Sequence, residues 1–99
     1  MVKLLVLYGH PKDPAAFERH YAERHLPLAQ QIPGLRRLET ARVVARNGDQ
    51  PDPYRVASLY FDSLDDLEAG MASDEGQASG ADAASIATGG IDRLVFTLD

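Results

Sequence analysis

The stretch VKLLVLY, residues 2–8, decides the fold, because it is an apolar run interrupted only by Lys3. β-Branched and aromatic residues favour a strand, and a nearly unbroken apolar run is typical of a strand that is covered on both faces. The run is too short for a membrane span, and Pro11 follows it too closely for a signal peptide. We therefore expect a strand with two covers, which the rest of the sequence has to supply.

A helix follows this strand, between residues 14 and 31. Asp13 is the expected N-cap, and Pro14 occupies the first helical position, where its missing N–H costs nothing. Pro33 and Gly34 are typical residues just beyond the end of a helix. This helix is the first candidate cover.

The middle of the chain predicts a hairpin. Residues 35–46 and 54–62 alternate between polar and apolar side chains, and the second run is rich in aromatic residues. Between them, the Asn-Gly pair and the two prolines of residues 47–53 are typical of a turn. We expect two antiparallel strands with a long, exposed loop.

Two helical segments and a strand complete the chain. The first begins after the N-cap Ser63, with apolar residues at helical spacing, and the second runs from Ser73 to the Gly89-Gly90 pair. Gly76 and Gly80 each cost the second helix about 1 kcal/mol relative to alanine, so packing must stabilise it. Residues 91–99 form the closing strand.

The order β-α-β-β-α-β predicts an α+β, ferredoxin-like fold, with a four-stranded antiparallel sheet and the helices on one face. The first and last strands are too apolar to leave the other face in water. A second copy of the sheet is the simplest cover. We therefore expect a single domain over residues 1–99 and a homodimer that packs sheet against sheet.

Composition excludes several classes of function. The chain has 99 residues, with 44% hydrophobic and 25% charged residues, which is ordinary for a globular domain. A net charge of −5 argues against nucleic acid as a partner, and no segment suits a membrane. The absence of cysteine excludes thiolate metal sites and thiol nucleophiles, and gives no reason to expect an oxidising compartment. We expect a cytoplasmic protein.

Two long segments carry a recognisable pattern: YGHPKDPAAFERHYAERHLPLAQQIPGLRR, residues 8–37, and ASDEGQASGADAASIATGGID, residues 72–92. Both resemble the EthD family of the dimeric α+β barrel superfamily. The resemblance implies a barrel made of two facing sheets, with a cleft between sheet and helices in each subunit. The family is named for a gene cluster that degrades ethyl tert-butyl ether through a cytochrome P450. Similar barrels include muconolactone isomerases, polyketide cyclases, quinol-type monooxygenases and haem-degrading enzymes, so the fold does not select a reaction.

His25 is the candidate catalytic residue. It matches the histidine of the family pattern Tyr-x-x-x-His-x-Pro-Leu, formed here by Tyr21, His25, Pro27 and Leu28. Helical spacing brings His25 to the same face as Phe17 and Tyr21, toward the sheet. An imidazole there can transfer protons near neutral pH. The alternative is a buried histidine that only fixes the end of the helix beside Pro27.

Aromatic and polar residues near His25 are candidates for substrate binding. Tyr8 and His10 end the first strand and begin the next loop, with core packing and solvent exposure as the respective alternatives. Tyr60 is expected in the cleft, although alternation sends Tyr60 and Phe61 to opposite faces. The complete set of candidate substrate-binding residues is Tyr8, His10, Phe17, Tyr21 and Tyr60.

Three further polar residues are candidates for contact with these side chains or for the protein surface. Asp82 matches an acidic position of the family pattern and either orients a histidine or stabilises its own turn. Arg24 stands where relatives are expected to have a small hydroxyl residue, and changes the cleft mouth or adds a surface charge. His20 is expected on the flank of the helix.

No metal or cofactor is expected. The three histidines do not form an i, i+4 pair with other ligands around them. The sequence has no tryptophan, a residue prominent in the haem-degrading branch, and no glycine-rich phosphate loop or dinucleotide motif.

The sequence thus predicts a homodimer that binds a small hydrophobic organic molecule. The leading hypothesis is cofactor-free proton transfer by His25, of the isomerase or cyclase type, in a catabolic or secondary-metabolic pathway. One alternative is a cofactor-free monooxygenase, in which the carbanion of the substrate reacts with oxygen. The other is a non-enzymatic accessory or carrier protein of a P450-linked degradation system.

Overall fold

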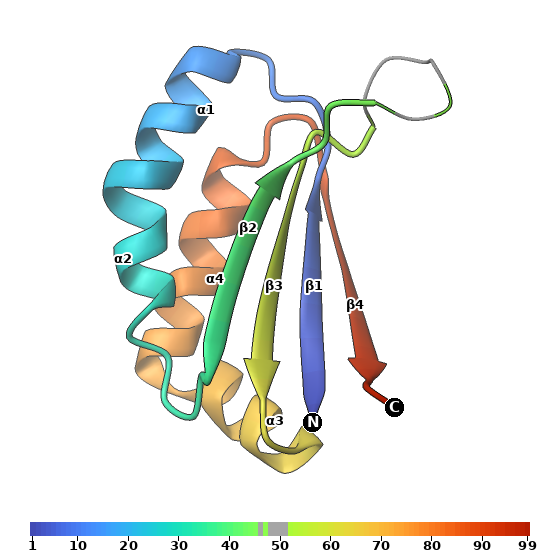
Figure 1. Cartoon of the computed structure of the whole chain (residues 1–99). Coiled ribbons are helices and arrows are strands. Elements are labelled where there is room, and N and C mark those ends of the chain that lie inside the picture. The colour runs from blue at the N-terminus through green and yellow to red at the C-terminus, as the bar shows by residue number, and fades with distance from the viewer. Residues whose placement is uncertain (46, 48–51) are drawn as a thin grey trace.

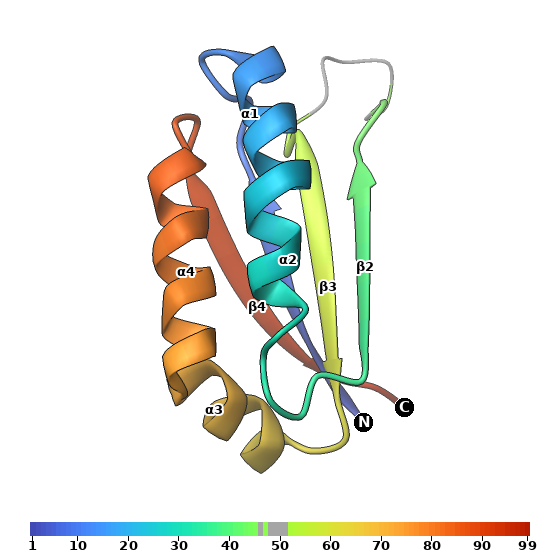
Figure 2. The same ribbon diagram turned by 90° about the vertical axis from the view of Figure 1, so that its left-hand side faces the viewer.

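A computed structural model describes residues 1–45, 47 and 52–99. Its helices all lie on one side of a single four-stranded sheet (Figure 1), and the same helices cover the sheet when they face the viewer (Figure 2). The elements in chain order are β1 (Val2–Tyr8), α1 (Pro14–His20), the π-helical turn η1 (Tyr21–His25), α2 (Leu26–Ala29), β2 (Arg37–Arg42), β3 (Arg55–Phe61), α3 (Leu64–Ala72), α4 (Asp74–Ile86) and β4 (Ile91–Thr97).

The sheet has the order β2-β3-β1-β4, and all three neighbouring pairs are antiparallel. β1 and β3 are therefore the two central strands. This arrangement confirms the predicted ferredoxin-like fold and places the first apolar stretch in the middle of the sheet, where it gains the most cover.

Alternation along β1 separates two faces of the sheet. Val2, Leu4, Val6 and Tyr8 point to the helices and are buried, whereas the residues between them are half-buried. The buried residues of β1 join side chains of the helices and of β3 in one core, which consists of Val2, Leu4, Val6, Tyr8, Phe17, Tyr21, Ala29, Ile32, Tyr54, Ala57, Leu59, Phe61, Leu67 and Ala83.

The opposite face of the sheet is open, and it carries exposed apolar residues along β4 beside charged ones such as Lys3 and Glu39. Leu94 and Phe96 of β4 have 47% and 39% of their surface exposed there, next to Leu5 and Lys3 of β1. Figure 1 shows that no described element lies over this face. The second cover predicted from the apolar strands is thus not part of the single chain, and the homodimer remains a prediction.

The helix after β1 begins as predicted but contains an unforeseen π-helical turn. The Asp13 side chain accepts a hydrogen bond from the Ala16 N–H at 3.1 Å, which confirms the N-cap. In η1 the Leu26 N–H bonds to the Tyr21 carbonyl, five residues back, instead of four. Pro27 then stands in the first turn of α2, directly after this π-helical turn.

The later helices confirm the predicted caps. Ser63 accepts a hydrogen bond from the Asp66 N–H at 3.1 Å, and Ser73 accepts one from the Gly76 N–H at 3.0 Å. β2 is shorter than the predicted run 35–46, because only residues 37–42 pair with β3. Of the predicted loop, residues 46 and 48–51 lie outside the described residues.

Candidate functional site

A cavity lies between the sheet, η1 and α4. Its volume is about 30 Å³, which is room for one or two water molecules. Most of its wall is apolar, and the polar groups that reach it are Tyr8, Tyr21, His25, Ser79 and Arg93. The other lining residues are Leu4, Val6, Leu26, Ala29, Leu38, Ala57, Leu59, Met71, Gly80 and Ala83.

His25 is held in this cavity by a carboxylate. Its Nδ1 lies 3.0 Å from Oδ2 of Asp82 in α4. A carboxylate only accepts, so Nδ1 carries the proton, and in the neutral imidazole Nε2 is left with a lone pair. The His25 side chain is 7% exposed and that of Asp82 is 17% exposed. The pair is therefore shielded from water, and the tautomer of His25 is fixed.

The free nitrogen of His25 faces the hydroxyl of Tyr8. The distance from Tyr8 Oη to His25 Nε2 is 3.5 Å, the long end of a hydrogen bond, with the phenol as donor. Burial raises the pKa of Tyr8 well above its ordinary value, so the phenol stays neutral and remains a donor. Tyr8 and His25 thus present a donor and a base side by side.

Asp82 also binds a second histidine. Its Oδ1 accepts a hydrogen bond from Nε2 of His20 at 2.8 Å, and the His20 side chain is 33% exposed. One carboxylate therefore joins a buried histidine in the cavity to a histidine that reaches solvent.

Burial lowers the pKa of His25 below its ordinary value. The hydrogen bond and the charge of Asp82 act in the opposite direction, and the charge of His20 lowers the pKa further. The net result keeps His25 neutral at neutral pH, which is the form that accepts a proton.

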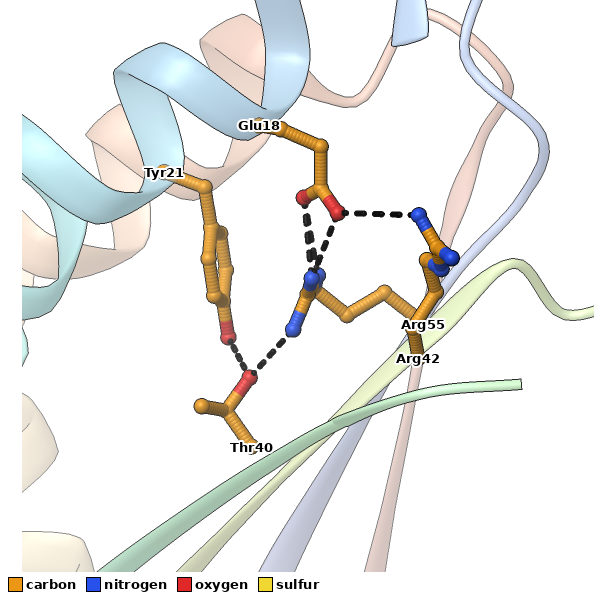
Figure 3. Close-up of polar contacts among 5 residues, drawn as sticks. All are labelled: Glu18, Tyr21, Thr40, Arg42 and Arg55. Atoms are coloured by element: carbon orange, nitrogen blue, oxygen red, sulfur yellow. Dashed lines mark hydrogen bonds and ion pairs between the residues drawn. The ribbon is translucent and has the colours of Figure 1, made fainter. Parts of the chain in front are cut away.

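A second polar network fixes Tyr21 beside the cavity (Figure 3). The Tyr21 hydroxyl lies 2.8 Å from the Thr40 hydroxyl, and the Arg55 guanidinium stacks 4.8 Å from the centre of the Tyr21 ring. Glu18 accepts two hydrogen bonds from Arg55 Nη2, at 2.6 and 2.9 Å, and lies 3.9 Å from Arg42.

This network also holds His25 in place, because it fixes the Tyr21 ring that packs against the imidazole. The Tyr21 ring stacks on the His25 ring, with centroids 5.3 Å apart and planes 28° apart. Asp82 on one side and the Tyr21 ring on the other leave the imidazole little freedom, which is the preorganisation that proton transfer requires.

Comparison with protein families identifies the chain. The model of the EthD domain matches residues 10–90, which include the whole His25 and Asp82 arrangement. The chain belongs to the EthD domain family. The resemblance seen in residues 8–37 and 72–92 is therefore confirmed.

Relatives of this EthD chain share its length and fold. An uncharacterized 11.0 kDa protein from the thcB-thcC intergenic region of Rhodococcus erythropolis is 42% identical over 97 residues, covering 98% of this chain and 93% of the relative. The crystal structure of an ethyl tert-butyl ether degradation (EthD) family protein from Bacillus halodurans is 36% identical, with a TM-score of 0.95 over 100% of this chain and 99% of that one.

Two solved structures at 20% identity share the fold alone. One is SnoaB, a cofactor-independent oxygenase from Streptomyces nogalater, with a TM-score of 0.67 over 98% of this chain and 90% of SnoaB. The other is a dimeric protein of ferredoxin-like fold and unknown function from Bacteroides fragilis, with a TM-score of 0.69 over 98% of this chain and 95% of that chain. The fold therefore occurs in dimers.

The predicted site residues of the EthD chain fall into two groups. Tyr8, Tyr21 and His25 come together in the cavity. Phe17 is buried in the core against Tyr8 and lines a separate hollow of about 250 Å³ at the surface, beside His20. His10 is exposed and packs edge-on against Tyr54, with ring centroids 5.2 Å apart, so it does not reach the cavity.

The expectation that Tyr60 lies in the cleft is wrong. Tyr60 points to the open face, where its hydroxyl donates to Glu39 at 2.7 Å and Lys3 lies 5.6 Å from its ring centre. Its neighbour Phe61 takes the buried position toward the helices, with 0% of its surface exposed. Both strand neighbours are aromatic, so composition could not decide which of them faces inward.

Several residues of this arrangement are not among the site residues predicted from the sequence. The sequence indicates that Asp82 either orients a histidine or stabilises its own turn, and in the structure its side chain contacts two histidines, His20 and His25, across 62 and 57 residues. No sequence motif marks Thr40, Arg55 or Arg93. A signal existed in β2 and β3, where Thr40 and Arg55 interrupt the apolar pattern on the helix side, as polar residues do when they have a partner.

The described part of the chain has neither a metal-ligand cluster nor a membrane-spanning helix. Residues 1–45, 47 and 52–99 contain no group of three or more histidine, cysteine or acidic side chains that could hold a metal ion. Within the same ranges, no helix has the length and apolarity needed to span a membrane.

Proposed function

We propose that the cavity binds a small, mostly apolar organic molecule and that His25 moves a proton on it without a cofactor. The observation that carries this proposal is the hydrogen bond from His25 Nδ1 to Asp82, which leaves Nε2 as a lone pair facing the cavity. A neutral base held in a dry, apolar site by a buried carboxylate is suited to general base catalysis.

The proposed step uses three side chains. His25 Nε2 takes a proton from a carbon or hydroxyl of the substrate, and Asp82 stabilises the imidazolium that forms. The Tyr8 hydroxyl, which faces His25 Nε2 in the free protein, turns to donate its hydrogen bond to the substrate oxygen on which negative charge develops. Return of the proton to another atom of the substrate completes an isomerisation or cyclisation.

The cavity has to enlarge for this function. Its volume of about 30 Å³ is far below the roughly 300 to 1,000 Å³ of typical small-molecule sites. Met71, a flexible and half-buried side chain in its wall, and Gly80, beside which no atom lies within 4 Å of an added Cβ, are the parts that yield most easily. The substrate enters by displacing them.

The test uses carbon acids whose exchange is slow in water. Incubating 1-indanone or 2-tetralone in deuterated buffer and following deuterium at the α-carbon by NMR measures proton transfer directly. The wild type is expected to accelerate exchange, and His25→Gln to lose about 100-fold of the acceleration. His10→Gln is the matched control, because His10 is exposed and outside the cavity.

The outcomes separate enzyme from carrier. Ketones that bind both wild type and His25→Gln, with no accelerated exchange by either, would favour the accessory or carrier function. Acceleration that survives in His25→Gln would contradict the role of His25 as the base.

The fold likeness to SnoaB supports a second candidate, cofactor-free oxygenation. Removal of a proton by His25 leaves a carbanion, and molecular oxygen is the co-reactant that such chemistry requires. Oxygen consumption in the presence of an electron-rich phenol, lost in His25→Gln, would distinguish it from isomerisation.

We also infer that two chains associate through the open sheet face. Its exposed apolar residues include Leu94 and Phe96, and burying them removes a patch that soluble monomers rarely expose. The dimeric neighbour from Bacteroides fragilis has the same fold, which supports this inference.

A further inference from the structure

Arg93 brings a guanidinium to the cavity. It lies in β4 opposite Val6 of β1, and cross-strand partners point to the same face of a sheet, so Arg93 faces the helices. Arg93 is itself exposed to solvent, and it also lines the cavity together with Tyr8 and His25. Its charge acts on the Tyr8 hydroxyl, where it opposes the rise in the Tyr8 pKa that burial causes.

This guanidinium has no acidic partner in the part of the chain that the structure describes. No carboxylate oxygen of residues 1–45, 47 or 52–99 lies within ion-pair distance of it. Arg42 and Arg55, which face the helices from β2 and β3, both pair with Glu18. Arg42 and Arg55 thus share one carboxylate within the fold, whereas Arg93 pairs with none in the described residues.

The edge of the cavity beside Arg93, along β4, is only partly covered by the helices. Val95, the next residue of β4 on the same face, is 53% exposed, so the helix layer does not fully cover this edge strand. Across the cavity, an added Cβ at Gly80 would meet no atom within 4 Å. A ligand that enters between α4 and β4 therefore passes the Arg93 guanidinium.

We propose that Arg93 binds a carboxylate of the ligand. The ligand is then a small, mostly apolar monocarboxylate, whose charged end is held at this edge of the cavity while its apolar part reaches toward His25. This inference rests on the proposed function of the cavity. Guanidinium binds carboxylate through two parallel, charge-assisted hydrogen bonds, and a local cation offsets the repulsion between an anionic ligand and a chain of net charge −5.

The test compares acids with neutral amides of the same shape. The probes are butanoate, cyclohexanecarboxylate and 3-phenylpropionate, each paired with its primary amide, and binding is followed through the NMR signals of the Ala83 methyl group and the His25 ring. For at least one pair, the acid is expected to bind about 10- to 100-fold more tightly than the amide. Arg93→Gln is expected to abolish this preference and to leave amide binding unchanged.

Arg24→Gln is the matched control. It removes the same charge from an exposed position on η1 that does not line the cavity, and is expected to keep the preference for acids. If Arg24→Gln weakens acid binding as much as Arg93→Gln does, the effect is one of net charge and the inference is overturned.

Failure of the inference differs from failure of the proposed function. If acids and amides bind equally well, or if the preference survives in Arg93→Gln, the inference is wrong while ligand binding stands. If no acid or amide shifts the cavity signals at millimolar concentration, the proposed function fails as well.

Discussion

At the scale of the residue, Asp82 of α4 connects two histidines, one from α1 and one from η1. Its two oxygens bind His20 and His25, at 2.8 and 3.0 Å. Helical spacing was sufficient to place His25 on the face toward the sheet, and the structure confirms that it is buried there. The sequence left two roles open for Asp82, of which orienting a histidine was one. It could not decide between them, because the contact depends on how α4 packs against η1, and no local pattern encodes that packing.

Removal of the Asp82 charge is expected to lower the pKa of His25 further. Both the hydrogen bond and the charge of Asp82 raise that pKa against the larger effect of burial, so in Asp82→Asn burial acts with less opposition. An NMR titration of the imidazole signals measures this shift. Asp62→Asn, an exposed residue paired with Arg36, is the control and is expected to leave His25 unchanged. An unchanged or higher pKa in Asp82→Asn would show that Asp82 does not act on His25 as described.

The lowered pKa of His25 makes folding stability depend on pH. In the unfolded chain His25 titrates near its ordinary value of about 6.5, and in the folded protein it binds its proton only at lower pH. Between these two values the unfolded state holds more protons, so stability rises with pH across this window and is lost as pH falls through it.

Urea denaturation at about pH 7.5, 6.5 and 5.5 tests this dependence. Relative to His25→Gln, the wild type is expected to lose free energy of unfolding between the second and third pH values, with little relative change between the first two. An advantage of the wild type that grows toward low pH would give the opposite sign and refute the assignment.

At the scale of the element, close packing between α3 and α4 explains a sequence that propensity disfavours. A Cβ at Gly76 would lie 2.2 Å from the Gly70 carbonyl oxygen, so Gly76 allows the two helices to meet. The sequence predicted that packing holds α4, and this contact is the reason for one of its two glycines. The π-helical turn η1 was not predicted, because a period of 3.6 residues describes its apolar face almost equally well.

The two glycines of α4 are expected to respond oppositely to alanine. Gly76→Ala forces a backbone shift and should cost about 1 to 3 kcal/mol. Gly80→Ala meets open space and should gain about 0.5 to 1 kcal/mol, because alanine favours a helix and loses less entropy on folding. Thermal or urea unfolding of both variants measures the difference. Equal losses would mean that α4 does not pack on α3 as described.

At the scale of the whole molecule, the main feature is that the helices cover one face of the sheet and leave the other face open. The apolar pattern of the strands predicted the fold correctly because β1 is central and Val2 to Tyr8 need cover on both sides. Alternation also predicted that Tyr60 and Phe61 face opposite ways, but not which of them faces the helices. The direction depends on the register of β3 against β1, which pairs Phe61 with Val2, and register is a property of the assembled sheet.

A charge on the open face is expected to separate the proposed dimer. Leu94→Glu would bury a carboxylate between two sheets, and the variant should elute and scatter light as a monomer at micromolar concentration, where the wild type is expected to be a dimer. Val95→Glu is the matched control, since Val95 is similarly exposed but lies on the face toward the helices. A monomeric wild type, or equal dissociation of both variants, would contradict the sheet-to-sheet dimer.

The Glu18 network has a kinetic consequence. Through Arg55 and Arg42, Glu18 ties α1 to β2 and β3 (Figure 3). The ion pairs of α4 in the described residues run from Asp82 to α1 and η1 and not to the sheet, and one of the two glycines of α4 faces empty space. The two walls of the cavity therefore differ in how often they move apart. Brief excursions of α4, and not of α1, set the rate at which anything enters, so association is expected to be slow and steeply dependent on temperature even for a ligand that binds tightly.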